Sequence, residues 1–204
     1  PLGTNTNRWD EVLCDIKNTT KERFLYDVSM VGSLYTEKSP YGKLKLSEMD
    51  RGFVDGIMES QRRFMGMDLL EEAITDDLVA SIKNADAKCD SKSWQSYVLP
   101  DVFCDTDRYV ALNYYLGMHM SKEERVDTLN ALAKDYKVEL FTRSDARALK
   151  GVHVHGGVTT HKEMPLVFYR SKINLNMTIR PIQMGLSQRV WDVLGCEGFL
   201  LSNY

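Results

Sequence analysis

The chain lacks several features that would assign it to a function class at once. Its 204 residues include four cysteines but no Cys-x-x-Cys pair, so we expect reduced thiols in a cytoplasmic protein rather than a disulfide framework. No apolar run approaches the roughly 20 residues that a membrane-spanning helix needs. No Gly-x-Gly-x-x-Gly fingerprint follows the first predicted strand, which argues against a dinucleotide cofactor.

A strong net charge is also absent. Lys and Arg number 26 against 29 Asp and Glu, which gives a formal net charge of −3. A broad basic face is the electrostatic signature of proteins that bind nucleic acid or anionic membranes. The charge balance therefore argues against both kinds of partner.

The chain also lacks a recognisable set of metal ligands. His153 and His155 alternate on a predicted strand and should face the same side of it. No third ligand follows at a recognisable spacing, whereas structural zinc takes four ligands. We therefore predict no metal site, and we interpret these histidines as strand residues that lead into Gly156 and Gly157.

The pattern that is present alternates strands with helices. Strands are predicted at 24–34, 136–142, 152–158, 173–177 and 199–202, the last two of them buried, with helices at 121–135, 162–170 and 187–196. This alternation is typical of an α/β fold with a Rossmann-like parallel sheet. We treat residues 1–204 as one domain that carries a large helical insertion at about 46–119.

Helix starts can be read at two places. Ser47 precedes an amphipathic run and is predicted to cap it. Ser121 and Glu124 have the spacing of a capping box, which predicts a helix that begins at Ser121.

The helical insertion at about 46–119 is also a candidate surface for oligomer formation.

The stretch 171–204 predicts an anion site. A strand and a polar loop precede a helix that is entered through Gly185, Leu186 and Ser187. The unpaired N–H groups and the positive dipole end of such a helix attract phosphate. Arg180 and Arg189 flank this N-terminus, and Asp192 follows one turn later, so the ligand should carry both phosphate and hydroxyl groups. An ordinary capped helix with surface charges is the structural alternative.

Four segments, in order, resemble one protein family. Residues 1–6 look like a linker into a Rossmann-like domain, and 27–35 resembles the pattern DVSFVGxLY. Residues 163–176 resemble MPxVYxxSxINLN, and 189–201 resembles RxFExxAxGGFLL. The whole chain is thus similar to the C-terminal, donor-binding half of a bacterial GT-B glycosyltransferase, closest to the spore-maturation (CgeB-like) family.

The resemblance implies transfer of a sugar from a nucleoside diphosphate donor to an acceptor that it does not identify, without a cofactor and without a bound metal. It also makes the chain a fragment, since the chain begins at Pro1 without Met and ends just after a predicted strand. We expect the fragment to bind nucleotide without turnover. The candidate donor-binding residues are Gly32, Ser33, Gly157, Val158, Asn176, Arg180, Leu186, Ser187, Arg189 and Asp192.

Two departures from the family pattern leave an alternative open. Asp192 stands where the family usually has Glu, whose implied role is to bind the ribose hydroxyls. Glu197 replaces the first glycine of a Gly-Gly pair and is expected to bring negative charge near the diphosphate, where it either points away to solvent or weakens donor binding. Both departures suit a non-catalytic nucleotide-binding or partner-binding module. A third possibility, a different Rossmann-type enzyme such as an epimerase, is weakened by the missing glycine fingerprint.

Overall fold

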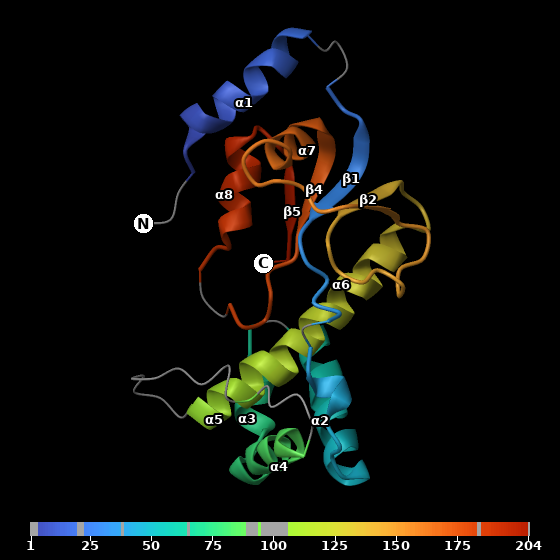
Figure 1. The fold of residues 1–204 in the computed structure, drawn as a ribbon. Helices are drawn as coiled ribbons and strands as arrows, with labels where there is room; N and C mark the ends of the chain where they lie inside the picture. The colour runs from blue at the N-terminus through green and yellow to red at the C-terminus, as the bar shows by residue number, and fades with distance from the viewer. Residues whose placement is uncertain are drawn as a thin grey trace. The chain divides into compact units, whose positions relative to one another are not determined.

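The computed structural model of the protein describes residues 4–19, 23–37, 39–64, 66–88, 94, 106–182 and 185–203. It divides into two compact units. The sheet unit comprises Pro1–Thr36, Arg125–Thr178 and Ile182–Tyr204, and the helical unit comprises Glu37–Glu124 and Ile179–Pro181. Figure 1 shows both units.

The sheet unit contains five strands that all run parallel. They are β1 (Tyr26–Val31), β2 (Val138–Phe141), β3 (His153–His155), β4 (Ser171–Asn176) and β5 (Leu200–Ser202). Their order in the sheet is β3-β2-β1-β4-β5, with β1 central. An all-parallel sheet in this order is a Rossmann-like α/β arrangement, so the predicted fold class is confirmed.

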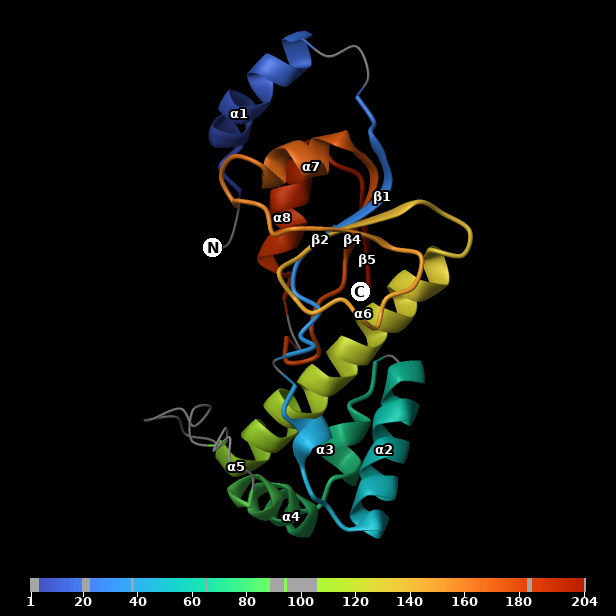
Figure 2. The ribbon, with the colours of Figure 1, turned by 45° about the vertical axis from the view of Figure 1, so that its right-hand side comes forward.

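Helices cover both faces of this sheet (Figures 1 and 2). Leu129 of α6 (Met118–Leu132) packs with Val28, Val138 and Leu140 of the strands on one face. On the other face, a second cluster joins α1 (Thr6–Thr19), α7 (Met164–Arg170) and α8 (Gln188–Gly195). Parallel sheets are stable when both faces are buried in this way.

A buried polar network joins β1 and β4 beneath α7. Ser29 and Asn174 are 0% and 1% exposed, and they lie side by side in the ladder. The Ser29 hydroxyl donates to Asn174 Oδ1 at 3.2 Å, and Asn174 Nδ2 donates to the Phe168 carbonyl at 3.0 Å. Since unsatisfied buried polar groups are costly, these bonds fix the polar residues of two otherwise apolar strands.

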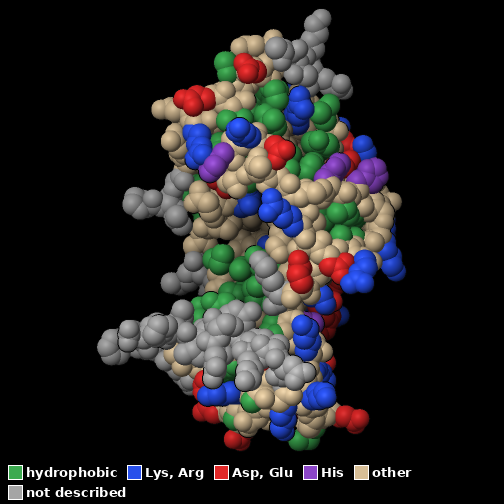
Figure 3. All heavy atoms as spheres, viewed as in Figure 1, with side chains coloured by type: hydrophobic (Ala, Val, Ile, Leu, Met, Phe, Trp, Pro, Cys, Tyr) green, Lys and Arg blue, Asp and Glu red, His purple; other side chains and the backbone are tan. Residues whose placement is uncertain are grey.

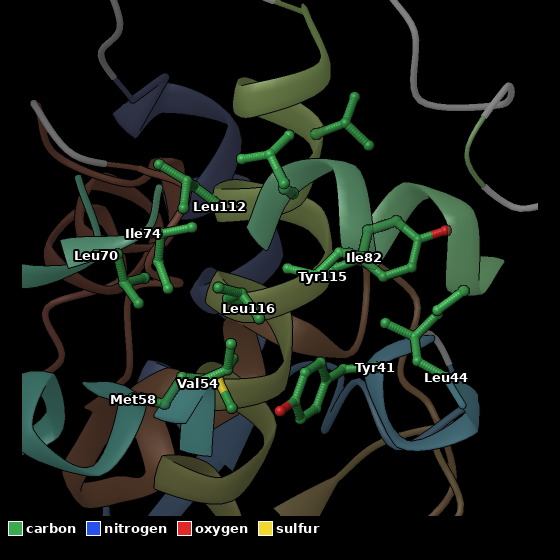
Figure 4. Packing of buried hydrophobic residues seen from close by; sticks show 14 of the residues in the cluster. Tyr41, Leu44, Val54, Met58, Leu70, Ile74, Ile82, Leu112, Tyr115 and Leu116 are labelled. Atoms are coloured by element: carbon green, nitrogen blue, oxygen red, sulfur yellow. The ribbon is translucent and has the colours of Figure 1, made fainter. Parts of the chain in front are cut away.

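The helical unit has a core of its own. Its elements are η1 (Tyr41–Lys43), α2 (Glu48–Arg63), α3 (Leu69–Ala73), α4 (Asp76–Ala87), α5 (Thr106–Tyr109), the π-helical segment η3 (Val110–Gly117) and the start of α6. Figure 4 shows Val54, Ile82 and Leu116 among the side chains that converge in this core. The predicted Ser47 cap of α2 is confirmed, since its side chain accepts from Asp50 N.

The predicted capping box at Ser121 and Glu124 is wrong. Both residues lie inside α6, which continues without a break from the π-helical segment. The Ser121 hydroxyl donates to the Gly117 carbonyl at 2.7 Å and accepts from the Arg180 N–H at 2.9 Å. Glu124 pairs with the Arg180 side chain. These two polar side chains hold the segment around Arg180 instead of starting a helix.

Two of the four cysteines can be described. Cys14 and Cys196 both have free thiols, while Cys89 and Cys104 lie outside the described residues. Burial raises the pKa of the Cys196 thiol to about 12, so it stays protonated and unreactive at neutral pH. Among the described residues, no helix combines the length and the apolar character that crossing a lipid bilayer requires.

Two glycine substitutions should change stability in opposite directions. At Gly198 an added Cβ would lie 2.8 Å from Asn174 Nδ2 and 2.9 Å from a Val193 methyl. Overpacking of this kind lowers the free energy of unfolding by about 1–3 kcal/mol. At Gly52 in α2 nothing lies within 4 Å of an added Cβ. Replacing glycine by alanine in a helix interior raises the free energy of unfolding by about 1 kcal/mol.

Urea unfolding should therefore show Gly198→Ala destabilised and Gly52→Ala stabilised relative to wild type. A Gly198→Ala variant as stable as the Gly52→Ala variant would contradict the close packing between α8 and β4.

Candidate functional site

The order of the strands marks one edge of the sheet as the place for a ligand. The chain moves outward from β1 to β2 and β3 on one side, and β4 and β5 lie on the other side. Parallel α/β sheets bind ligands beyond the carboxyl ends of their strands, at the point where the strand order reverses. Here that point lies between β1 and β4, and the loops that leave these strands begin at Gly32 and Met177.

The loop after β1 contains the predicted residues Gly32 and Ser33. The Gly32 N–H donates to the Phe141 carbonyl at 3.1 Å, which extends the ladder by one bond. The Ser33 hydroxyl lies 3.0 Å from that of Ser144, in the loop after β2, and Ser144 Oγ also accepts from the Leu34 N–H at 2.9 Å. The loop after β1 is therefore tied to its neighbour on the β2 side.

Tyr35 gives this loop an unusual backbone. Its φ is +60°, in the left-handed region that residues other than glycine rarely adopt. Its N–H donates to Ser33 Oγ at 3.0 Å, and its ring lies 4.8 Å from the Arg125 guanidinium. Strained backbone of this kind persists where the surroundings hold it, often at ligand sites.

Arg125 was not predicted as a site residue. It lies on α6, it is 8% exposed, and its guanidinium donates to the carbonyls of Ser33 and Met177. One side chain thus joins the loops that follow β1 and β4. Nothing in the local sequence marks it, because its two carbonyl partners are 92 and 52 residues away along the chain.

The predicted anion site lies at the N-terminus of α8. Gly185 has φ of +96°, a conformation that favours glycine, and Leu186 after it is 55% exposed. Ser187 occupies the N-cap position, but its side chain makes no capping hydrogen bond. Its hydroxyl donates instead to Asn176 Oδ1 at 3.2 Å. The side chain that normally caps a helix is thus used to join α8 to the end of β4.

Asn176 is a connector at the end of β4. It is 6% exposed, and its Nδ2 donates to the Ser202 hydroxyl at 2.9 Å and to the Thr178 hydroxyl at 3.1 Å. Together with the bond from Ser187, these contacts join β4, β5 and α8. Because Asn176 is almost fully buried, its contacts assign it to holding this edge of the sheet.

Arg189 and Asp192 lie together on α8. Arg189 Nη1 is 3.4 Å from Asp192 Oδ2, and Gln188 Nε2 is 3.3 Å from Asp192 Oδ1. The Arg189 guanidinium also contacts Met164 Sδ and lies 5.5 Å from the Phe168 ring of α7. Burial lowers the pKa of Arg189 below its ordinary value, while Asp192 and Tyr35 act in the opposite direction.

Arg180, the other predicted arginine, belongs to the helical unit. Its Nε donates to Glu124 Oε1 at 3.0 Å, and both side chains are less than one-fifth exposed. A phosphate would have to compete with this carboxylate for the guanidinium. Its phosphate role stays a prediction.

The loop after β3 contains Gly157 and Val158. A Cβ on Gly157 would lie 2.5 Å from Arg143 Cγ and 2.6 Å from Arg143 Nε. The exposed Arg143 side chain, from the loop after β2, crosses Gly157 and would have to shift if this position carried a Cβ. Gly157 is one of the predicted donor-binding residues, whereas Arg143 is not.

The two histidines of β3 both face a buried carboxylate. His155 Nε2 lies 2.6 Å from one oxygen of Glu139 in β2, and His153 Nδ1 lies 3.5 Å from the other. Burial opposes ionisation of Glu139, but the bonds from His155 and Lys137 outweigh it and hold the pKa below its ordinary value. Across the described part of the chain, no group of three or more His, Cys, Asp and Glu side chains could hold a metal ion.

Glu197 lies at the opposite end of α8 from the predicted phosphate site. The helix has eight residues, so its ends are roughly 12 Å apart. The Glu197 carboxylate pairs with Lys17 of α1 at 2.6 Å, and its carbonyl accepts from Arg23 at 2.6 Å. The expectation that this charge lies near the diphosphate is therefore wrong, because the residue follows the C-cap of the helix instead of preceding its N-terminus.

The surface charge of the described residues agrees with the composition. On the face seen in Figure 3, Lys and Arg side chains are interspersed with Asp and Glu. The positive groups considered for the site, Arg125 and Arg189, are buried or half-buried individual side chains.

Comparison with known proteins finds a family resemblance in one part of the chain. Residues 122–204 match the family model described as glycosyl transferase-like. This part of the chain is similar to glycosyl transferase-like domains. The match covers β2 to β5 with α7, α8 and most of α6, and it leaves β1 and nearly all of the helical unit outside. Searches of curated proteins and of solved structures gave no match.

The backbone conformation of Glu197, just after α8, should lower the stability of the protein. Its φ is +58°, and a left-handed conformation costs a side-chain-bearing residue about 1–2 kcal/mol. Glu197→Gly and Glu197→Ala both remove the pair with Lys17, so they differ in backbone freedom. We expect the glycine variant to exceed the alanine variant by about 1 kcal/mol in unfolding free energy. Equal stabilities in urea unfolding would show that this conformation carries no strain.

Proposed function

We propose that the chain is the donor-binding part of a nucleotide-sugar-dependent glycosyltransferase of the GT-B type. The main support is that the glycosyl transferase-like match covers the helix and strands around the predicted phosphate site. The order of the sequence motifs supports the finer placement in the bacterial spore-maturation (CgeB-like) family. In the proposed reaction, the bond from the sugar's anomeric carbon to the diphosphate breaks, and a bond to an acceptor nucleophile forms.

The leaving diphosphate is the group that this site would stabilise. It gains negative charge as its bond to the sugar breaks, and fixed donors in a partly buried site favour that charge. The N-terminal N–H groups of α8 are not capped by the Ser187 side chain. Arg189 lies in the first turn of the same helix and can fork onto phosphate oxygens.

Asp192 is the proposed partner of the ribose. The residue is 8% exposed, and its carboxylate contacts with Gln188 and Arg189 measure 3.3 and 3.4 Å. Charge-assisted hydrogen bonds are normally about 2.7–2.9 Å long, so both contacts are weak. The carboxylate can exchange them for two hydroxyl groups while Arg189 turns to phosphate. The base would lie by Gly157 and Val158, beside the exposed Arg143 side chain.

A non-catalytic binding module is the alternative. The pairing of Arg180 with Glu124 favours it, since Nε of this predicted phosphate ligand already donates to a carboxylate at 3.0 Å. In that case the glycosyltransferase fold would be kept while donor binding was weakened or lost.

Calorimetric titration with UDP, UMP, GDP and GMP tests the proposed function. We expect a diphosphate to bind more tightly than its monophosphate, because the second phosphate gains the α8 N-terminus and Arg189. Arg189→Ala should weaken diphosphate binding by about tenfold or more, since a hydrogen bond to a charged group contributes roughly 1.5–3 kcal/mol. The same substitution should leave monophosphate binding nearly unchanged.

Arg63→Ala is the matched control. Arg63 is exposed on α2 and pairs only locally with Glu59 in the bonds described for it, so its loss should leave every affinity at the wild-type value. Equal losses of diphosphate and monophosphate affinity in Arg189→Ala would contradict the phosphate assignment. No binding of any of the four nucleotides would favour the binding module with another partner.

A further inference from the structure

Arg125 occupies the point where the strand order reverses. The ladder between β1 and β4 ends with the pair Met30 and Leu175. Beyond that pair Val31 is paired with β2 and Asn176 with β5, and the two chains then leave for different loops. Arg125 spans them there, because one guanidinium donates to the carbonyls of Ser33 and Met177. Main-chain hydrogen bonds join β1 and β4 along the strands, and the Arg125 side chain joins the two loops that follow them.

The chemistry of arginine suits this position. A guanidinium is a rigid plane with five N–H donors that point in several directions, so it can serve two acceptors from different segments at once. A lysine ammonium is a compact charge on a flexible stem and lacks this fixed fork. Arg125 is also nearly inaccessible to solvent, at 8% exposure. Its position is thus fixed by the packing of α6 against the sheet.

Arg125 also supports the strained residue in the loop. The Tyr35 ring lies 4.8 Å from the guanidinium, within the range of a cation–π contact. Tyr35 has φ of +60° and needs surroundings that hold it. Arg125 contacts both the carbonyl two residues before Tyr35 and the Tyr35 ring itself. On the other side, Ser144 holds the same loop through the Leu34 N–H.

We propose that Arg125 is a positioning residue that holds the loops after β1 and β4 in the conformation that receives the nucleoside diphosphate. The proposal rests on the proposed function, and it adds a residue that makes its contacts from α6, outside the loops themselves. Arg125 acts through the two loops, since both hydrogen bonds go to main-chain carbonyls. Its loss should therefore loosen the loops and weaken diphosphate binding while the sheet stays folded.

Arg125→Lys and Arg125→Gln test this proposal, with Arg23→Lys as the matched control. Arg23 likewise donates to a main-chain carbonyl, that of Glu197, and stacks on an aromatic ring, that of Tyr169, at 4.6 Å. Its carbonyl partner lies beyond the C-terminal end of α8, away from the proposed phosphate site. Both substitutions to lysine remove a guanidinium that donates to a main-chain carbonyl and stacks on an aromatic ring, so both should lower thermal stability.

Two measurements separate positioning from stability. Titration with UDP and GDP should show the wild-type diphosphate affinity reduced about tenfold or more in both Arg125 variants and changed less than about twofold in Arg23→Lys. Hydrogen exchange of the unliganded proteins should be faster at residues 32–36 and 177–178 in the Arg125 variants only. The exchange measurement does not need a bound nucleotide.

The outcomes are distinct. Arg125 variants that bind with wild-type affinity, or that lose affinity no more than Arg23→Lys at equal loss of thermal stability, would overturn the positioning role. Unchanged exchange in both loops would overturn it as well. If wild-type protein binds neither UDP nor GDP, the proposed function fails. In that case, faster hydrogen exchange confined to the two loops of the Arg125 variants would still show that Arg125 stabilises the loop conformation.

Discussion

The reversal of strand order between β1 and β4 is the constraint on which the rest of the site depends. Two neighbouring parallel strands send their chains in opposite directions at the same edge of the sheet, and the main-chain ladder cannot continue there. A parallel sheet leaves this gap by its topology. The protein bridges it with the buried guanidinium of Arg125 and ties the loop after β1 to the loop after β2 through Ser144.

The two ends of helix α8 make different contacts with the rest of the sheet unit. At its N-terminus Ser187 joins β4 instead of capping the helix, which leaves the positive end of the dipole toward the proposed ligand. At its C-terminus Glu197 turns the chain in a left-handed conformation and pairs with Lys17. Gly198 then allows the chain to pass close to Asn174 and Val193. The negative charge of Glu197 thus lies at the end of α8 opposite to the proposed phosphate site.

Much of the fold could be predicted from the sequence because its strands are short runs that end in small or polar residues, and the three inner strands β2, β1 and β4 contain buried residues. The strands that end before Gly32 and Gly156 and the helix that begins after Ser187 all lie within a few residues of their predicted positions. Local signals of this kind depend on hydrophobic burial and helix capping. They do not depend on distant parts of the chain.

The errors arose where distant contacts override a local pattern. Ser121 and Glu124 fit a capping box, but the helix continues from the π-helical segment, and both side chains hold Arg180. Arg125 resembles a surface arginine in its local sequence, and only the folded chain brings Ser33 and Met177 to it. The predicted roles of the ten site residues in donor binding stay predictions, since they concern a ligand.

Backbone amide chemical shifts, followed by NMR during titration with UDP and then GDP, test the central claim most directly. The account predicts that the largest shift changes fall at residues 32–36, 177–178 and 185–190, where the loops after β1 and β4 and the start of α8 lie. Changes confined to the helical unit, or to the β3 and β5 edges of the sheet, would contradict it.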